Sequence, residues 1–147
     1  MKRRVTIWAI CFVALIAWAG LVCAQTTKTG TMKTVKYSDG EEVCDLTGEW
    51  DAFLENLGEW AKYGSYSNEI KIKLEGRSFI GTRLKDNGPN RPAGSLILIC
   101  SLDKSGFKNI ILNTGFGPFP CKGQISEDGN KIIIEMDTRA KVTLTRK

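Results

Sequence analysis

The sequence predicts an all-β protein, an antiparallel up-and-down β-barrel of eight strands. The first observation is a strict alternation of apolar and charged residues from Glu69 to Glu75, which is typical of a strand with one buried face. The second is the regular occurrence of turn sequences, of which Glu127-Asp128-Gly129-Asn130 is the strongest hairpin signal. The third is the lack of a long helical pattern between the strands. Closing the strands into a barrel removes exposed edges, although a sandwich of two four-stranded sheets fits the same strand count.

The eight strands and their links follow from the positions of these turns. We expect the strands at about 47–54, 69–75, 78–84, 95–102, 107–114, 121–126, 131–137 and 140–146. Consecutive antiparallel strands place their links at alternating ends of a barrel. We call the end with the tight turns the floor (links 76–77, 103–106 and 127–130). We call the end with the longer links the rim (links 55–68, 85–94 and 115–120).

The alternation within the strands predicts which side chains face the interior. Lysines 71, 73 and 141 are expected on the outer face, opposite the inward residues. The inward set is expected to comprise Ile70, Ile72, Leu74, Ile97, Ile99, Ile132, Ile134, Val142 and Leu144. An eight-stranded barrel is either filled by side chains or holds one small ligand, and bulky Ile and Leu favour a filled interior.

The first 24 residues are predicted to be a secretory signal peptide. Lys2-Arg3-Arg4 precedes an apolar run from Val5 to Val22, and Val22-Cys23-Ala24 places small or apolar residues before a cut after Ala24. We therefore expect an exported protein, periplasmic or secreted, with features typical of bacteria. Two alternatives remain open: an uncleaved membrane anchor at residues 5–22, and a lipid attached to Cys23.

The remaining 123 residues suffice for one domain. Residues 25–43 are rich in Thr, Lys and Gly and are predicted to be a flexible leader before a barrel domain at 44–147. The net charge of +5 includes three basic residues of the signal peptide, so 18 basic and 16 acidic residues remain, a net charge of +2. The basic residues are scattered rather than clustered, and we expect no nucleic-acid partner.

The sequence contains no histidine, which excludes Ser-His-Asp and Cys-His catalysis and imidazole metal sites. We expect no metal, no cofactor and no enzymatic activity. A hydrolase is the remaining catalytic alternative, built on the carboxylates Glu49, Asp51, Glu55 and Glu59 around the first strand. That alternative needs two carboxyl groups about 5–9 Å apart in a cleft.

Three cysteines remain after the expected cleavage: Cys44, Cys100 and Cys121. An exported protein lies in a compartment where disulfides persist. Cys44 and Cys100 are both expected near the floor, whereas Cys121 begins a strand at the rim. The predicted disulfide is therefore Cys44–Cys100, with Cys121 left as a free thiol.

The rim links carry the candidate binding residues. Trp60, Tyr63 and Tyr66 lie in link 55–68, Arg91 in link 85–94, and Phe116 and Phe119 in link 115–120. Aromatic rings with a nearby cation suit a small hydrophobic or amphipathic ligand. The alternatives are rings that only cap the core, and a filled barrel whose rim contacts a protein or cell-envelope partner.

Gly48-Glu49-Trp50 at the start of the first strand and Arg146 at the end of the last one resemble the calycin pattern of lipocalins and avidin-like barrels. The resemblance covers about residues 45–147. It implies that Trp50 closes the floor of a cup and that Arg146 stacks across its ring, both in structural roles. It also implies that the link 55–68 acts as a lid over the mouth.

Overall fold

The computed structural model describes residues 31–147, which form one large antiparallel sheet and one small hairpin. The predicted signal peptide 1–24 lies outside the described residues. The alternatives of an anchor at 5–22 and of a lipid on Cys23 lie outside them as well.

The elements of the described residues follow one another with short links. In chain order they are β1 (Thr34–Lys36), β2 (Glu42–Cys44), β3 (Gly48–Asn56), the 3-10 helix η1 (Gly58–Tyr63), β4 (Tyr66–Glu75), β5 (Ser78–Arg83), β6 (Leu96–Asp103), β7 (Gly106–Thr114), β8 (Gly117–Pro120), β9 (Lys122–Ile125), β10 (Lys131–Met136) and β11 (Ala140–Arg146).

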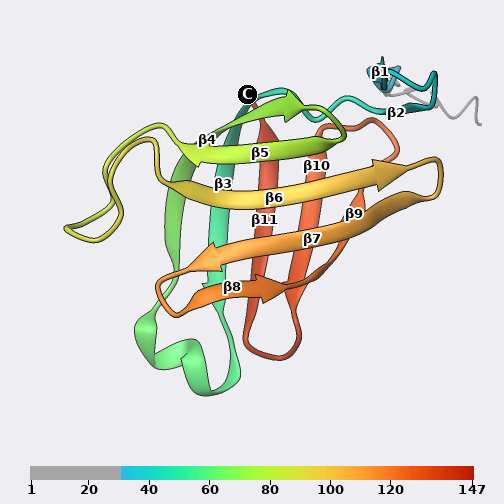
Figure 1. Ribbon diagram of the computed structural model, residues 1–147. Coiled ribbons are helices and arrows are strands. Elements are labelled where there is room, and N and C mark those ends of the chain that lie inside the picture. Colours follow the sequence, from blue (N-terminus) through green and yellow to red (C-terminus); the bar gives the residue numbers. More distant parts are fainter. Residues whose placement is uncertain (1–30) are drawn as a thin grey trace, which may run out of the picture.

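The large sheet has the order β8-β7-β6-β5-β4-β3-β11-β10-β9, with antiparallel pairing throughout. Figure 1 shows its strands as two crossing layers, β5 to β8 in front of β3, β4, β11 and β10. Its two edge strands, β8 and β9, are consecutive in the chain and meet at Cys121, whose N–H donates to Ile110 O of β7 at 2.9 Å. The sheet is thus a nearly closed barrel, which confirms the all-β antiparallel prediction and replaces the alternative of two separate sheets.

The large sheet has nine strands instead of the eight predicted. The expected strand 121–126 is β9, and the additional strand, β8, forms within the expected link 115–120. The chain changes partner at Cys121, so that β8 pairs with β7 and β9 pairs with β10. Pro118 and Pro120 lie in β8, an edge strand of the sheet, where a residue without an N–H is tolerated. The rim link 115–120 shortens to Gly115-Phe116 as a result.

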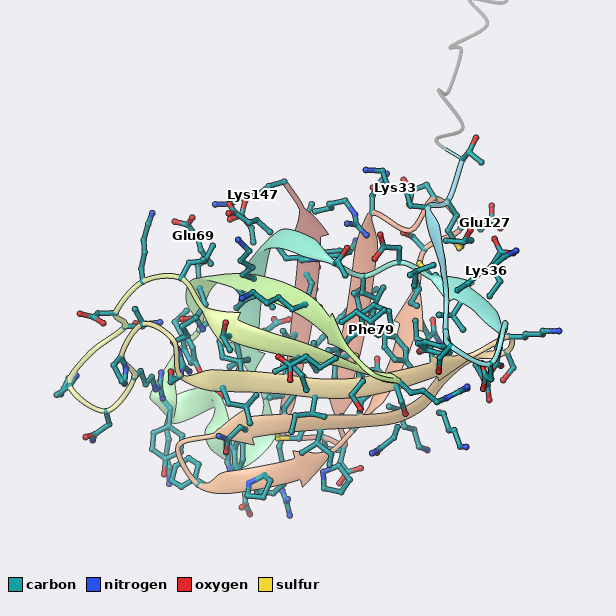
Figure 2. The ribbon with its side chains drawn as sticks, turned by 45° about the horizontal axis from the view of Figure 1, so that its top comes forward. Lys33, Lys36, Glu69, Phe79, Glu127 and Lys147 are labelled. Carbon is teal, nitrogen blue, oxygen red and sulfur yellow. The ribbon has the colours of Figure 1, made fainter. Side chains whose placement is uncertain are left out.

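The core lies between the two layers. Ile70, Ile72, Ile132, Ile134, Val142 and Leu144 are buried as predicted. The prediction for β6 was wrong in its phase, because this strand buries Leu98, Cys100 and Leu102 and turns Ile99 toward the other face. Ile97 lies at a β-bulge opposite β5 and lines the interior cavity. Residues 96–100 are apolar on both faces of the strand, and only the polar Ser101 indicates which face points outward. In Figure 2 Phe79 lies in the middle of the molecule, whereas Glu69 and Lys147 form an ion pair at its surface.

The floor is closed by Trp50 and Arg146. Trp50 is fully buried, and its indole N–H donates to Leu46 O at 2.9 Å. The Arg146 guanidinium lies 4.3 Å above the ring centroid and donates to Thr47 O at 2.7 Å and to Asp45 O at 2.6 Å. A third contact joins it to Gly129 O at 3.4 Å. Arg146 thus connects the segment before β3 to the β9–β10 turn.

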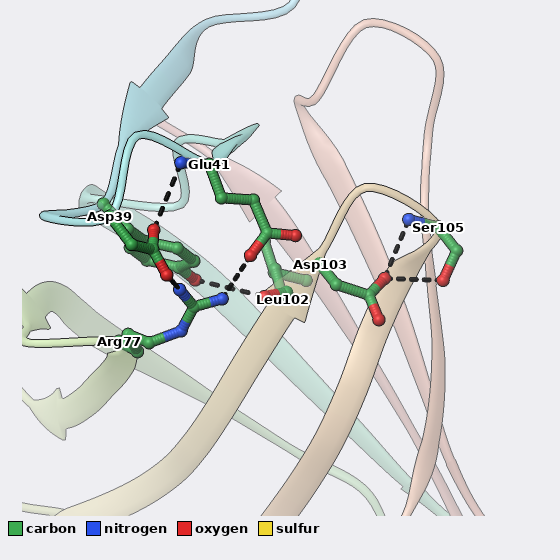
Figure 3. A network of polar contacts seen from close by, with 7 residues as sticks. Asp39, Glu41, Arg77, Leu102, Asp103 and Ser105 are labelled. Atoms are coloured by element: carbon green, nitrogen blue, oxygen red, sulfur yellow. Dashed lines mark hydrogen bonds and ion pairs between the residues drawn. The ribbon is translucent and has the colours of Figure 1, made fainter.

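The β1–β2 hairpin covers the floor from outside. Tyr37 and Val43 of this hairpin are buried in the core, so residues 34–43 belong to the fold and not to the expected leader 25–43. Figure 3 shows Arg77 of the β4–β5 turn paired with both Asp39 and Glu41.

The contacts of Tyr37 reinforce this closure. Its hydroxyl donates to Leu102 O at 3.4 Å, and Arg77 lies 4.4 Å above its ring. Burial raises the pKa of Tyr37, which keeps the hydroxyl protonated as a donor. The hairpin is therefore packed against the turns of the floor.

Candidate functional site

The rim contains a hollow of about 240 Å³. Five of the six predicted ligand-binding residues line it, from three separate segments: Trp60, Tyr63, Tyr66, Arg91 and Phe116. Leu54 and Thr114 form part of its wall on the side of the barrel. The sixth predicted residue, Phe119, lies on β8 instead of a loop and packs edge-on against Trp60, with ring centroids 5.6 Å apart.

The aromatic side chains of the hollow pack against one another and remain open to solvent. Phe116 lies 5.3 Å from Trp60 and 5.7 Å from Tyr63 between ring centroids. Even so, Phe116 is 65% exposed and Tyr63 is 55% exposed. Two large rings this exposed at one end of a small domain form an apolar surface that is available for contact.

The helix η1 positions Trp60 through its attachment to the neighbouring turn. Leu57 N–H, just before η1, donates to Arg139 O of the β10–β11 turn at 2.7 Å. Gly58 has φ +52°, and a Cβ there would lie 3.1 Å from Thr138 O, so only glycine allows this close approach. The segment that carries Trp60 is therefore held against the barrel at its first residue.

The cations of the rim lie over aromatic rings and not against carboxylates. Arg91 lies 4.5 Å above the ring of Tyr66, and Arg139 lies 5.8 Å from Trp60 and 5.6 Å from Phe119. No ion pair within residues 31–147 involves either arginine. The rim thus combines apolar surface with positive charge that is not neutralised locally.

A residue that the sequence analysis missed, Arg83, lies just below the rim. It ends β5, where alternation places Phe79, Gly81 and Arg83 on the inner face, and it is only 8% exposed. Its Nη1 donates to Ser95 Oγ at 2.6 Å, while its Nε is buried without a hydrogen-bond partner. Burial lowers its pKa, and an arginine still stays protonated. Phe79 lies four residues before Arg83 in the same strand, so alternation from this apolar residue could have predicted that Arg83 faces the interior.

The interior of the barrel next to Arg83 is nearly filled. The cavity there measures about 30 Å³, room for about two water molecules. Its polar lining comes from Tyr66, Asn68, Asn113 and Thr114 in addition to Arg83. It shares Leu54, Tyr66 and Thr114 with the rim hollow, so the two spaces adjoin.

The predicted disulfide Cys44–Cys100 is wrong for this structure. All three described cysteines are free thiols, and no two of them lie at bonding distance. Cys100 points into the core from β6, whereas Cys44 lies against the β9–β10 turn near Gly129. Burial raises the pKa of Cys100 to about 12 and raises those of Cys44 and Cys121 as well. None of the three is activated as a nucleophile.

The carboxylates considered for a hydrolase lie on the outside. Glu49, Asp51, Glu55 and Glu59 are all exposed, and Asp51 pairs with Lys147 at 3.3 Å. Within residues 31–147, no cluster of three or more Cys, Asp or Glu side chains is arranged to hold a metal ion. None of the helical residues between 31 and 147 forms a helix long and apolar enough to cross a membrane.

Comparison of the chain with known protein families, with curated proteins and with solved structures finds no match.

Proposed function

We propose that this protein is an exported, non-enzymatic β-barrel that binds a small amphipathic molecule at its rim. The observation that carries the proposal is the hollow of about 240 Å³, in which Trp60, Tyr63, Tyr66, Arg91 and Phe116 meet from three segments of the chain. Apolar, concave surfaces with a few polar groups are the usual form of small-molecule sites. The calycin-like arrangement of Trp50 and Arg146 agrees with a cup that is closed below and open above.

The volume of the hollow limits what it holds. Drug-sized ligands occupy about 300–1,000 Å³, so this site takes a smaller molecule or leaves part of a larger one in solvent. The interior cavity of about 30 Å³ adds little room. The ligand therefore lies across the aromatic rim and does not fill the barrel.

A second candidate function is the binding of a protein or cell-envelope partner by the same rim. The filled barrel and the exposure of Phe116 and Tyr63 favour it. The two candidates differ in what the rim binds: a small molecule in the first, a macromolecule in the second.

Native mass spectrometry of the protein purified from its own host tests the first candidate. We expect an added mass of a few hundred daltons that disappears on denaturation. We also expect the adduct to be lost from the variant Phe116→Ala and retained in Phe53→Ala, because Phe53 is an exposed aromatic residue of β3 that does not line the hollow. An adduct that persists equally in both variants would place the ligand elsewhere, and a bare protein would favour the second candidate.

A further inference from the structure

Arg83 is a buried cation without a counterion. Within residues 31–147 its guanidinium makes a single hydrogen bond, from Nη1 to Ser95 Oγ at 2.6 Å, and its Nε has no partner. A buried charge that is neither paired nor fully hydrogen-bonded is expensive to maintain. A bound molecule that supplies the missing hydrogen-bond partners and the opposite charge would offset this cost.

The groups around Arg83 leave its charge uncompensated. Neither the interior cavity nor the rim hollow is lined by an aspartate or glutamate of the described residues. The nearby polar side chains are already engaged in part: Asn113 donates to Leu96 O, and Thr114 donates to Gly117 O. Burial lowers the pKa of Arg83, and the positive charge of Arg91, the other arginine of this region, lowers it further. The position therefore attracts an anion.

The geometry of the free donors selects the kind of anion. With Nη1 held by Ser95, Nε–H and one N–H of Nη2 lie on the same edge of the planar guanidinium, and neither makes a hydrogen bond within residues 31–147. This planar pair of donors matches the two oxygens of a carboxylate. The adjoining cavity of about 30 Å³ has room for a group of that size and not for a bulkier head group.

We propose that Arg83 binds the carboxylate of an amphipathic ligand whose apolar part lies in the aromatic hollow of the rim. Leu54, Tyr66 and Thr114 line both spaces, so a single short molecule can reach from Arg83 to Trp60 and Phe116. This inference rests on the proposed function and names the ligand class for it: a monocarboxylic acid with a short aliphatic or aromatic body.

Isothermal titration calorimetry tests the proposal with two matched pairs of probes. Octanoate is compared with 1-octanol, and 4-phenylbutyrate with 4-phenyl-1-butanol, so that only the head group differs within each pair. We expect each acid to bind about 10- to 100-fold more tightly than its alcohol, since charged hydrogen bonds to a buried guanidinium contribute that difference. In Arg83→Met we expect the acids to fall to the affinity of the alcohols.

Two further variants separate a specific contact from general charge. Arg77→Met removes one positive charge at the floor and is expected to leave the preference for acids unchanged. Arg83→Lys keeps the charge but loses the paired donors, and is expected to recover only part of the preference. Circular dichroism of each variant verifies that it is folded.

The outcomes separate this inference from the proposed function. Acids and alcohols that bind equally, and equally in Arg83→Met, would overturn the role of Arg83 and leave the rim site standing. A preference for acids that Arg77→Met abolishes as completely as Arg83→Met would also overturn it. Probes that all fail to bind would count against both the carboxylate site and the proposed function.

Discussion

The two ends of the barrel each hold an arginine next to aromatic side chains, and the two arginines are satisfied to very different degrees. At the floor, Arg146 donates to three backbone carbonyls and covers the ring of Trp50. Below the rim, Arg83 donates to one hydroxyl and leaves its Nε without a partner. The arginine of the floor is thus satisfied by the protein itself, whereas the arginine below the rim is not.

The same contrast holds for the surroundings of each end. The floor is covered by the β1–β2 hairpin, and Arg77 there is paired with two carboxylates. At the rim, Arg91 and Arg139 lie over aromatic rings, and Phe116 and Tyr63 face solvent. An arginine at an aromatic ring is therefore not evidence of a binding site by itself. Its hydrogen-bond partners distinguish a structural role from a binding one.

The largest expected effect comes from the two tryptophans. Trp50→Ala is expected to lower the free energy of unfolding by about 3–5 kcal/mol, because a fully buried ring at the floor is removed. Trp60→Ala is expected to lower it by only about 1–2 kcal/mol, because its ring is half-buried and packs mainly against Phe116 and Phe119. Urea unfolding measures both values. Equal losses would contradict the division into a structural floor and a binding rim.

The reactivity of the three cysteine thiols tests the structure of the barrel interior. Because the pKa of Cys100 is about 12, its thiolate fraction at pH 8 is roughly 1,000-fold below that of a thiol with pKa 9. We expect iodoacetamide to leave Cys100 unlabelled in the native protein. In guanidinium without reductant, all three of Cys44, Cys100 and Cys121 should be labelled, as read by mass spectrometry. If only one of them is labelled until reductant is added, a disulfide is present after all.

Replacing each arginine by methionine is expected to change the free energy of unfolding in opposite directions. Arg146→Met should lower the free energy of unfolding by about 1.5–3 kcal/mol, since charged hydrogen bonds to carbonyls are lost. Arg83→Met should raise it by about 1–2 kcal/mol in the ligand-free protein, since an unpaired buried charge is removed. Urea unfolding of the two variants tests the pair. A loss of stability in both would mean that Arg83 is structural.

The smallest expected effect concerns Glu69, at neither end of the barrel. Hydrogen bonds from Lys147 and Lys85 lower its pKa from 4.5 to about 2. Because the folded pKa is depressed, its contribution to stability is present above about pH 4.5 and is lost as the pH falls toward 2. Unfolding curves from pH 6 to pH 2 should show the wild type converging on Glu69→Gln at the acid end. Parallel curves would show that these ion pairs contribute nothing.

The sequence by itself determined much of the architecture. Alternation placed β4, β10 and β11 with their buried faces, and the turn residues placed the floor links, because both signals depend only on neighbours along the chain. The aromatic side chains of the rim were also predictable, since strand order sends their three links to the same end.

Long-range contacts decided the rest. The pairing of residues 117–120 with β7 made a strand, β8, of the expected link 115–120, and the chain then changes partner at Cys121. Only packing decided which face of β6 is buried, because residues 96–100 are apolar on both faces. Residues 34–43, which were expected in the leader, are part of the fold because Tyr37 and Val43 are buried against the floor. Arg83 is one arginine among many in the sequence. Its isolation from every carboxylate exists only where β5 and its neighbouring strands enclose it, and the proposed carboxylate site depends on that enclosure.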